Sequence, residues 1–467
     1  MFILMVVVFV LGYLAIALEH PLKVDKAASA LLIGVLTWVL YMTGSFDILM
    51  SGVSPAWNEF AAANPEHANK EGMMHFITHN QLLEHLGEIS EILFFLLGAM
   101  TIVEIVDRHG GFTIITDKIK TTKKVNLLWI ISFITFFMSA ALDNLTTTIV
   151  MVALLRKLIQ DKETRWFFAS MVVLAANAGG AWSPIGDVTT IMLWIGGQVT
   201  AGQIIMMVFL PSLVCLVVPL IVLSFTMKGQ VQRPSSVDHS DSTHAPVDTS
   251  KRLKVFILLL GVGALLFVPV FKTLTHLPPY LGMLFGLSIL WITTELLHRA
   301  RKEKKRPNLQ VTSILTRIDT PTILFFLGIL LAVASLQSAG QLRILAEALD
   351  NSLGNIFLID LAIGILSSVV DNVPLVAGAM GMYPIEAAGA TGYAANFVQD
   401  GLFWEFLAYC AGTGGSILII GSAAGVAAMG MEKIDFIWYL KRISLLALIG
   451  YLAGAATYYG QAMLVHF

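Results

Sequence analysis

Three aspartates lie inside long apolar segments of this 467-residue chain: Asp143, Asp187 and Asp371. An ionised aspartate at the centre of a bilayer costs about 2.5–3.5 kcal/mol on insertion scales. No lysine or arginine lies close to them in sequence within the same apolar stretches, and none occurs between Trp166 and Met227. Unless a distant segment supplies a basic partner, each carboxyl group must hold a proton or a bound cation. Burial favours its protonated form and a cation favours its ionised form, so the pattern predicts a site where the two compete.

Asp187 also fits a purely structural role. Thr189 and Thr190 follow it, and a helix that begins there could use the Asp187 side chain as its N-cap. The sequence leaves both roles open.

Glycine-rich sequences are expected to interrupt two spanning helices, one in each half of the chain. The first break is expected at Gly179-Gly180 through Pro184-Ile185-Gly186, and the second at Gly412-Thr413-Gly414-Gly415. Non-helical backbone at membrane depth is tolerated only where protein or a water-filled cavity surrounds it. Close helix packing would explain one glycine pair. Two pairs in register, beside acidic segments, favour a cation site built from freed carbonyl, Thr and Ser oxygens.

A second acidic set follows one face of a helix: Glu84, Glu88 and Glu91, spaced four and then three residues apart. Glu88 or Glu91 is expected to feed protons to the site from the outer side of the membrane. A solvated helix end is the alternative for Glu84.

The composition is typical of a helical membrane protein. Of the residues, 57% are hydrophobic and 13% are charged, against roughly 25% charged in soluble domains. The 29 Lys and Arg residues do not exceed the 31 acidic ones, which excludes a nucleic-acid binder. No phosphate-binding loop, Ser/His/Asp arrangement or Cys/His metal set is recognisable in the sequence, so neither an enzyme, nor a resident cofactor, nor ATP-driven transport is expected.

Two apolar segments, 124–160 and 354–382, are interrupted at Asp143-Asn144 and Asp371-Asn372 and are predicted to be re-entrant hairpins. If every other apolar segment crosses the membrane once, nearly all of the 29 basic residues lie inside, the exceptions being Lys70, Lys272 and Arg343. This distribution agrees with the positive-inside rule. A full crossing in place of either hairpin would put basic loops on the wrong side.

The two halves of the chain repeat the same order of elements. ALDNLTTTIV (141–150) recurs as VVDNVPLVAG (369–378), and AGGAWSPIGD (178–187) recurs as TGGSILIIGS (413–422). Each half has an odd number of crossings, so the second copy must be inverted relative to the first. Inverted repeats with broken helices are typical of secondary transporters, whose site lies at the repeat interface near the midplane.

The predicted fold class is therefore an all-α polytopic membrane protein with two inverted repeats. The first repeat is 1–227, with its hairpin at 124–160 and a broken helix at 166–197. A cytoplasmic linker follows at 228–252. The second repeat is 253–467, with its hairpin at 354–382 and a broken helix at 401–430.

The motifs SAALDNLTTTIVMV, NAGGAWSPIGDVTTIMLW, SSVVDNVPLVAGAM and GTGGSILIIGSAAGVAAMG resemble those of the NhaD-type sodium/proton antiporters. This family belongs to the ion transporter superfamily, which also contains arsenite permeases and citrate and dicarboxylate carriers. The resemblance covers essentially the whole chain. It implies exchange of Na⁺ and Li⁺ for H⁺, in pH homeostasis, by a multi-pass homodimer in the lipid bilayer of a bacterial inner membrane.

The resemblance also implies a set of functional residues. In the first half these are Asp143, Asn144, Asn177, Asp187, Thr189 and Thr190. In the second half they are Ser367, Asp371, Asn372, Ser416 and Ser422. Glu88 and Glu91 match the acidic helix of the family. The halves differ at Asp187 against Ser422, so the site must be asymmetric.

Two other functions fit the same fold. A proton- or sodium-coupled carrier of arsenite or an organic anion is expected to point helix N-termini and basic or hydroxyl groups at its substrate. The acids at the hairpin tips disfavour an organic anion, and arsenite less so. The other function is a cation channel, in which Na⁺ flux would not be coupled strictly to H⁺.

Overall fold

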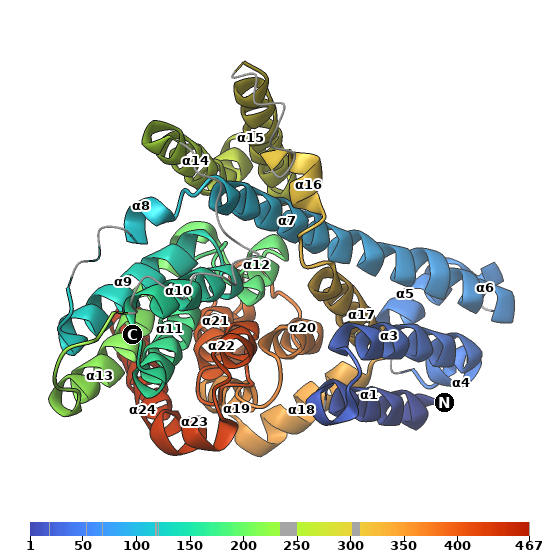
Figure 1. Ribbon diagram of the computed structural model, residues 1–467. Coiled ribbons are helices and arrows are strands. Elements are labelled where there is room, and N and C mark those ends of the chain that lie inside the picture. Colours follow the sequence, from blue (N-terminus) through green and yellow to red (C-terminus); the bar gives the residue numbers. More distant parts are fainter. Residues whose placement is uncertain are drawn as a thin grey trace. The chain divides into compact units, whose positions relative to one another are not determined.

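The computed structural model describes residues 1–17, 19–52, 54–67, 69–116, 119, 121–233, 250–300 and 309–466. Most of the predicted linker, at 234–249, and the basic run 301–308 lie outside the described residues. The structure is helical, and Figure 1 shows its elements in chain order. Within the described ranges, seven helices are long and apolar enough to cross a membrane, or nine if each of two bent pairs counts as one span.

The chain forms two compact units. Unit 1 consists of Met1–Leu93, Asp319–Ile359 and Val373–Glu386. Unit 2 consists of Phe94–Ile318, Asp360–Asn372 and Ala387–Phe467.

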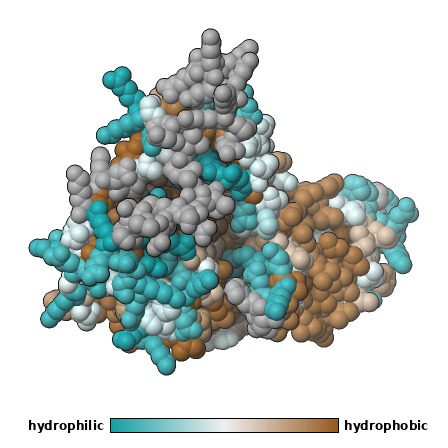
Figure 2. Space-filling view, viewed as in Figure 1, coloured by the Kyte–Doolittle hydropathy of each residue, from teal (hydrophilic) through white to brown (hydrophobic). Residues whose placement is uncertain are grey.

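Unit 1 is built on three apolar helices that pack together: α1 (Phe2–Ala17), α3 (Lys26–Thr43) and α17 (Thr320–Ser338). The backbones of α3 and α17 approach so closely that a Cβ atom on Gly34 would lie 2.5 Å from the carbonyl oxygen of Gly328. The outward side of these helices is apolar, with Ile3 76% and Leu32 60% exposed. Figure 2 shows this apolar surface. It is the surface expected of helices that contact lipid.

The remaining elements of unit 1 are shorter. They are α2 (Glu19–Leu22), α4 (Ser45–Met50), α5 (Pro55–Ala63), a 3₁₀ helix (Pro65–His67), α6 (Lys70–His75), a π-helix (Phe76–Leu82) and α18 (Gln341–Leu353). The π-helix runs without interruption into α7 (Leu83–Arg108), whose residues from Phe94 onward belong to unit 2. The segment 44–81 is therefore largely helical, and the apolar helix that contains α7 begins at Lys70.

Unit 2 contains the first predicted hairpin and its broken helix. The hairpin consists of α9 (Lys124–Ala141) and α10 (Asn144–Leu158), and the broken helix consists of α11 (Lys162–Ala181) and α12 (Val188–Ile195). α13 (Ala201–Thr226) completes this half, and α8 (Thr113–Thr116) precedes the hairpin. α11 packs against both arms of the hairpin.

The second half supplies a matching set of elements. These are α14 (Lys251–Thr275), α15 (Pro279–Ala300), α16 (Val311–Leu315), α19 (Ile356–Leu366), α20 (Asn372–Met382), a 3₁₀ helix (Gly392–Phe397), α21 (Leu402–Gly414), α22 (Ala423–Glu432), α23 (Phe436–Arg442) and α24 (Ser444–His466). α19 and α20, the two arms of the second hairpin, have residues in both units. The chain is bent by 52° between α23 and α24.

The breaks in the two interrupted helices begin a few residues after the glycines at which they were expected. α11 stays helical through Gly179 and Gly180, and α21 stays helical through Gly414. Gly179 is needed for packing, because a Cβ atom there would lie 2.2 Å from the carbonyl oxygen of Phe136 on α9. The packing alternative therefore holds for these glycines, and the irregular backbone itself runs over 182–187 and 415–422.

Candidate functional site

Four helix N-termini carry the polar side chains at the breaks of unit 2. Asn144 is the first residue of α10, and Asn372 is the first residue of α20. Asp187 and Ser422 are the N-caps of α12 and α22. Because the N-terminus of a helix has a partial positive charge, it stabilises negative charge and polar oxygen atoms placed there. These helix ends therefore determine where the polar network of the unit forms.

Asp187 is at the centre of this network and is 1% exposed. Its Oδ1 accepts hydrogen bonds from the backbone N–H of Thr189 (2.9 Å) and from Thr189 Oγ1 (2.7 Å). Its Oδ2 accepts a hydrogen bond of 2.6 Å from Asn144 Nδ2. Asn372 Nδ2 lies 3.4 and 3.5 Å from the two oxygens. All of these donors are neutral, so they orient the carboxylate without cancelling its charge.

Asn177 joins the two halves of the chain. Its Oδ1 accepts a hydrogen bond of 3.1 Å from Asn144 Nδ2. Its Nδ2 donates at 2.9 Å to both Ser416 Oγ and Ser422 Oγ in the second half. Tyr439 Oη donates to the carbonyl oxygen of Ser416 (2.7 Å), which holds the second break in position. Residues from both predicted repeats thus form one hydrogen-bonded network.

Asp143 and Asp371 are close enough to Asp187 to act on it electrostatically. Asp143 is the N-cap of α10 and accepts hydrogen bonds of 2.7 Å from the Thr146 N–H and from Thr146 Oγ1. Its backbone has φ = 142°, a conformation that strains any residue other than glycine. The described residues contain no group of three His, Cys, Asp or Glu side chains placed to hold one metal ion. The three acids therefore do not form a cage of carboxylates, and a cation would share one of them with amide and hydroxyl oxygens.

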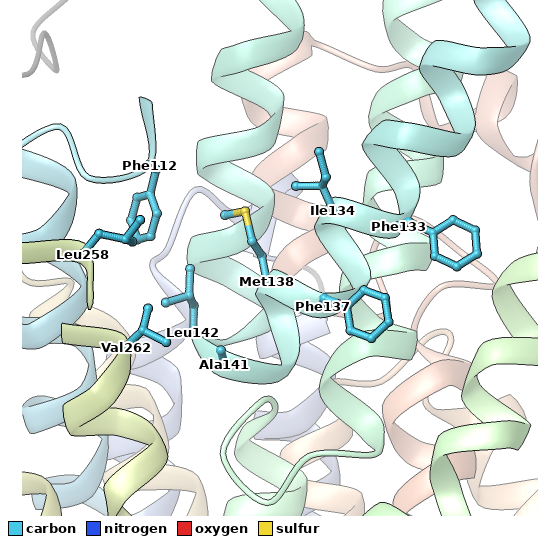
Figure 3. A pocket seen from close by; sticks show the side chains of 9 residues that line it. All are labelled: Phe112, Phe133, Ile134, Phe137, Met138, Ala141, Leu142, Leu258 and Val262. Atoms are coloured by element: carbon cyan, nitrogen blue, oxygen red, sulfur yellow. The ribbon is translucent and has the colours of Figure 1, made fainter. Parts of the chain in front are cut away.

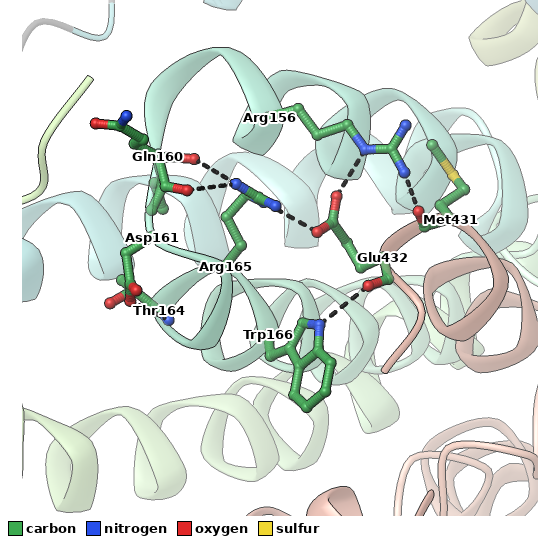
Figure 4. A network of polar contacts seen from close by, with 9 residues as sticks. Arg156, Gln160, Asp161, Thr164, Arg165, Trp166, Met431 and Glu432 are labelled. Atoms are coloured by element: carbon green, nitrogen blue, oxygen red, sulfur yellow. Dashed lines mark hydrogen bonds and ion pairs between the residues drawn. The ribbon is translucent and has the colours of Figure 1, made fainter. Parts of the chain in front are cut away.

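The capping role foreseen for Asp187 is confirmed, and it does not remove the charge. Within the residues that the structure describes, no lysine or arginine forms an ion pair with Asp143 or Asp187. Ion pairs of unit 2 lie elsewhere, for example at the buried Glu432, whose Oε1 and Oε2 bind Arg156 Nε (2.7 Å) and Arg165 Nε (2.9 Å). Figure 4 shows this network, in which Trp166 Nε1 also donates to the carbonyl oxygen of Glu432.

The other predicted residues lie in different settings. Thr190 Oγ1 donates to the carbonyl oxygen of Asp187 (2.9 Å), and Ser367 Oγ donates to that of Ala411 (2.9 Å), so both hydroxyl groups hold backbone. Glu88 and Glu91 belong to unit 1 and not to the unit of the network. The Glu88 side chain is 68% exposed and lies 3.2 Å from His85 Nδ1. A role for Glu88 or Glu91 in a proton pathway stays a prediction.

A cavity of about 400 Å³ lies between α9, α14 and the segment around Phe112. Figure 3 shows its lining, which includes Phe137, Met138 and Leu258 and has no titratable side chain. Its chemistry suits hydrocarbon and not an ion.

Sequence reasoning missed two buried acids of unit 2, Asp360 on α19 and Glu405 on α21, both 0% exposed. A comparison of the two repeats would have singled them out, because the first repeat has no acid at either position. When the paired motifs of the two halves are aligned, the first half has Ser132 and Ser170 at the matching positions.

The citrate transporter family matches residues 6–399 of the chain. Sodium/proton antiporter 1 of Arabidopsis thaliana is 48% identical over 456 residues, which cover 97% of this chain and 71% of that relative. Sodium/proton antiporter 2 of the same plant is 44% identical over 460 residues, which cover 97% and 98%. The Na(+)/H(+) antiporter NhaD of Vibrio cholerae is 31% identical over 480 residues, which cover 95% and 88%.

The apolar helices and these matches define a multi-pass membrane transporter, not an enzyme. The chain belongs to the citrate transporter family. Its resemblance to the NhaD-type antiporters, first seen in the paired motifs, is confirmed over nearly the whole chain.

Proposed function

We propose that this protein exchanges Na⁺ and Li⁺ for H⁺ by alternating access, with cation and proton competing at the carboxyl groups of unit 2. The observation that carries the proposal is the environment of Asp187. Its buried carboxylate is contacted by neutral amide and hydroxyl donors and has Asp143 and Asp371 as electrostatic neighbours. Negative charge gathered in a buried site must be balanced, and a proton or a small cation can do so.

The oxygens around Asp187 suit a hard cation. Carboxylate, amide carbonyl and hydroxyl oxygens are the ligands that such ions prefer. Asp187, Thr189, Ser416 and Ser422 would supply carboxylate and hydroxyl oxygens, and Asn144, Asn177 and Asn372 would supply amide oxygens. A bound cation requires the Asn side chains to turn their oxygens inward, because in the present network Asn144 and Asn177 direct amide nitrogens at Asp187 and the serines.

The wider assignment keeps the arrangement inferred from the sequence. We propose two inverted repeats, 1–227 and 253–467, whose broken helices meet at the site, and a homodimer that serves pH homeostasis. The names of the relatives support Na⁺ and H⁺ as substrates. The compartment is proposed as a bacterial inner membrane, although plant antiporters are among the relatives.

An anion carrier is the second candidate, because four helix N-termini meet at the network and the family is described by citrate. The two N-termini of the first half are already capped by Asp143 and Asp187. Their carboxylates oppose an anionic substrate. Antiport therefore accounts better for the charges.

The test uses the full-length protein in liposomes that contain a pH-sensitive dye. LiCl, NaCl, KCl, citrate and arsenite are added in turn, and H⁺ movement is recorded. We expect H⁺ movement driven by Na⁺ and Li⁺ only, and its loss in Asp187→Asn and in Asp143→Asn. Asp435→Asn is the control, because Asp435 caps α23 at an exposed position, where Asn can also cap.

Each other outcome overturns part of the proposal. H⁺ movement driven by citrate or arsenite alone supports the anion carrier. Na⁺ flux without coupled H⁺ indicates a channel. Full exchange by Asp187→Asn removes the assigned role of that carboxylate.

A further inference from the structure

Asp360 is a buried acid that takes no part in the hydrogen-bonded network around Asp187. It lies on α19 of the second hairpin and is 0% exposed. Neither of its carboxylate oxygens has a hydrogen-bond partner, and among the described residues Asp360 forms no ion pair. An ionised carboxylate that is buried without donors costs several kcal/mol more than a neutral acid. The carboxyl group is therefore stable in this position only while it holds a proton.

Phenol and thiol groups pack against α19 near Asp360: Tyr451 Oη donates to the carbonyl oxygen of the next residue, Leu361 (3.2 Å). Gly364, one turn later on the same face of α19, contacts α21 and α24, because a Cβ atom there would lie 2.2 Å from Tyr451 Oη and 2.9 Å from Cys410 Cβ. Cys410, Tyr451 and Tyr458 all interact electrostatically with Asp360. The thiol and phenol groups could donate to the carboxylate when it loses its proton.

Glu405 provides a second acid beside this cluster. It lies in the first turn of α21, and its Oε2 accepts a hydrogen bond of 2.8 Å from Tyr458 Oη. Gln203 of α13 also interacts with it. Tyr458 thus hydrogen-bonds to Glu405 and is close enough to Asp360 to interact with it electrostatically, without a hydrogen bond between the two.

The internal repeat shows that these acids are not part of the shared architecture. The first half has Ser132 and Ser170 where the second has Asp360 and Glu405, and those serines are buried in the same unit. A helix pair of this kind can therefore pack with serine at both positions. The two acids need an explanation other than packing.

We propose that Asp360 is a proton-carrying site of the transport cycle, separate from the Asp187 network, and that it exchanges its proton with Glu405 through Tyr458. In the relay, the Asp360 side chain first turns to donate a hydrogen bond to Tyr458 Oη, which in this structure lies 2.8 Å from Glu405 Oε2 and 3.1 Å from the carbonyl oxygen of Leu402. Tyr458 then gives its phenolic proton to the Glu405 carboxylate and takes the proton of Asp360. One O–H bond breaks and one forms at each step, and the net change is transfer of a single H⁺ from Asp360 to Glu405. The role in the cycle rests on the proposed antiport.

Infrared difference spectroscopy of the full-length protein in liposomes tests this directly. We expect a carbonyl band of a protonated carboxyl group that is lost in Asp360→Asn and in Asp360→Ser, the residue of the first half. The band should shift in D₂O and change when NaCl is added. Asp435→Asn should keep it. A wild-type spectrum without the band, or identical spectra for wild type and a folded Asp360 variant, overturns the proposal.

A second variant covers the case in which neither Asp360 variant folds, as judged by gel filtration and circular dichroism. Glu405→Gln can still accept the hydrogen bond from Tyr458, but it cannot take up a proton. We expect it to keep the band and to slow its shift in D₂O. A shift as fast as in wild type overturns the relay.

A separate measurement tests the antiport proposal. If wild type moves no H⁺ in response to Na⁺, antiport is wrong, whereas the band and its D₂O shift still show whether Asp360 holds an exchangeable proton. If wild type exchanges Na⁺ for H⁺ but the band does not respond to NaCl, Asp360 is a static neutral acid and the proposed place in the cycle is overturned.

Discussion

The two broken helices of unit 2 have the same backbone conformation at the break, but they differ in the residue that caps the helix after it. Asp187 and Ser422 cap α12 and α22 with nearly equal dihedral angles, φ −144° and ψ 146° against φ −145° and ψ 154°. Gly179 and Gly414 make equivalent contacts, since added Cβ atoms would lie 2.2 and 2.0 Å from carbonyl oxygens of α9 and α19.

The hairpins repeat this correspondence. Ser139 Oγ donates to the carbonyl oxygen of Ala176 (2.5 Å), and Ser367 Oγ donates to that of Ala411 (2.9 Å). The two serines begin the paired hairpin motifs, and the two alanines directly precede the paired motifs of the broken helices. Backbone geometry and the acids Asp143 and Asp371 are therefore shared between the halves. The other acids are not: Asp187 has no acidic counterpart in the second half, and Asp360 and Glu405 have none in the first.

Substitutions of the N-cap residues Asp187 and Ser422 should give the largest difference between the two halves. Asp187→Ser copies the second break into the first and should abolish Na⁺-driven H⁺ movement, because the buried carboxylate is lost. Ser422→Ala should reduce exchange much less than Asp187→Ser, because it removes one of several neutral oxygens, and should cost about 1 kcal/mol of stability through the lost N-cap. H⁺ movement and thermal unfolding of both variants are compared with wild type. Equal loss of exchange in the two variants would contradict the asymmetry.

The ion pairs of Glu432 have no counterpart in the first half, where the matching residue is Gly197. Glu432→Gln should lower the free energy of unfolding by about 1.5–3 kcal/mol, because charge-assisted hydrogen bonds to Arg156 and Arg165 are lost. Arg343→Gln, which disrupts the exposed pair with Glu347, is the control and should change stability by less than about 1 kcal/mol. Similar losses of stability in both variants would show that burial of Glu432 does not strengthen its ion pairs.

The shared contacts of Gly179 and Gly414 predict similar penalties in the two halves. Gly179→Ala and Gly414→Ala should each destabilise the protein by about 1–3 kcal/mol, because the added methyl groups meet backbone. Gly430→Ala on α22 has open space and should be neutral or slightly stabilising. The thermal midpoint of each variant is measured. A penalty confined to one half would show that the packing is not shared.

Removal of the N-cap of α11, which α21 lacks, should give the smallest effect on stability. Asp161 caps α11, whereas no side chain caps α21 at Gly401. Hydrogen bonds from Thr164 lower the pKa of Asp161, which lies in the loop before α11. The cap therefore stabilises the protein at pH above the unfolded-state pKa, and this contribution is lost as the pH falls through the lowered folded-state pKa.

Asp161→Ala should cost about 1 kcal/mol at neutral pH, and the difference from wild type should vanish in acid. Thermal unfolding of both proteins across a pH series measures it. A difference that persists at low pH would assign the effect to something other than the charge.

Much of the site was readable from the sequence because apolar segments and their interruptions are local properties. Aspartates between apolar residues drew attention to Asp143, Asp187 and Asp371, and the family resemblance of the paired motifs implied Asn144, Asn177, Asn372, Ser416 and Ser422. The position of each break was less readable. Glycine at a helix end serves either to end the helix or to admit a neighbouring backbone, and only the neighbour decides which.

The sequence by itself determined the membrane class, the approximate positions of the helix interruptions and the presence of aspartates at them, because hydropathy and charge are properties of the individual residues. Only the tertiary structure decided that Asn177 reaches Ser416 and Ser422, and that Glu88 lies in a different unit from Asp187. It also showed that Asp360 is buried without a hydrogen-bond donor. Contacts between residues hundreds of positions apart depend on packing, which no local pattern encodes.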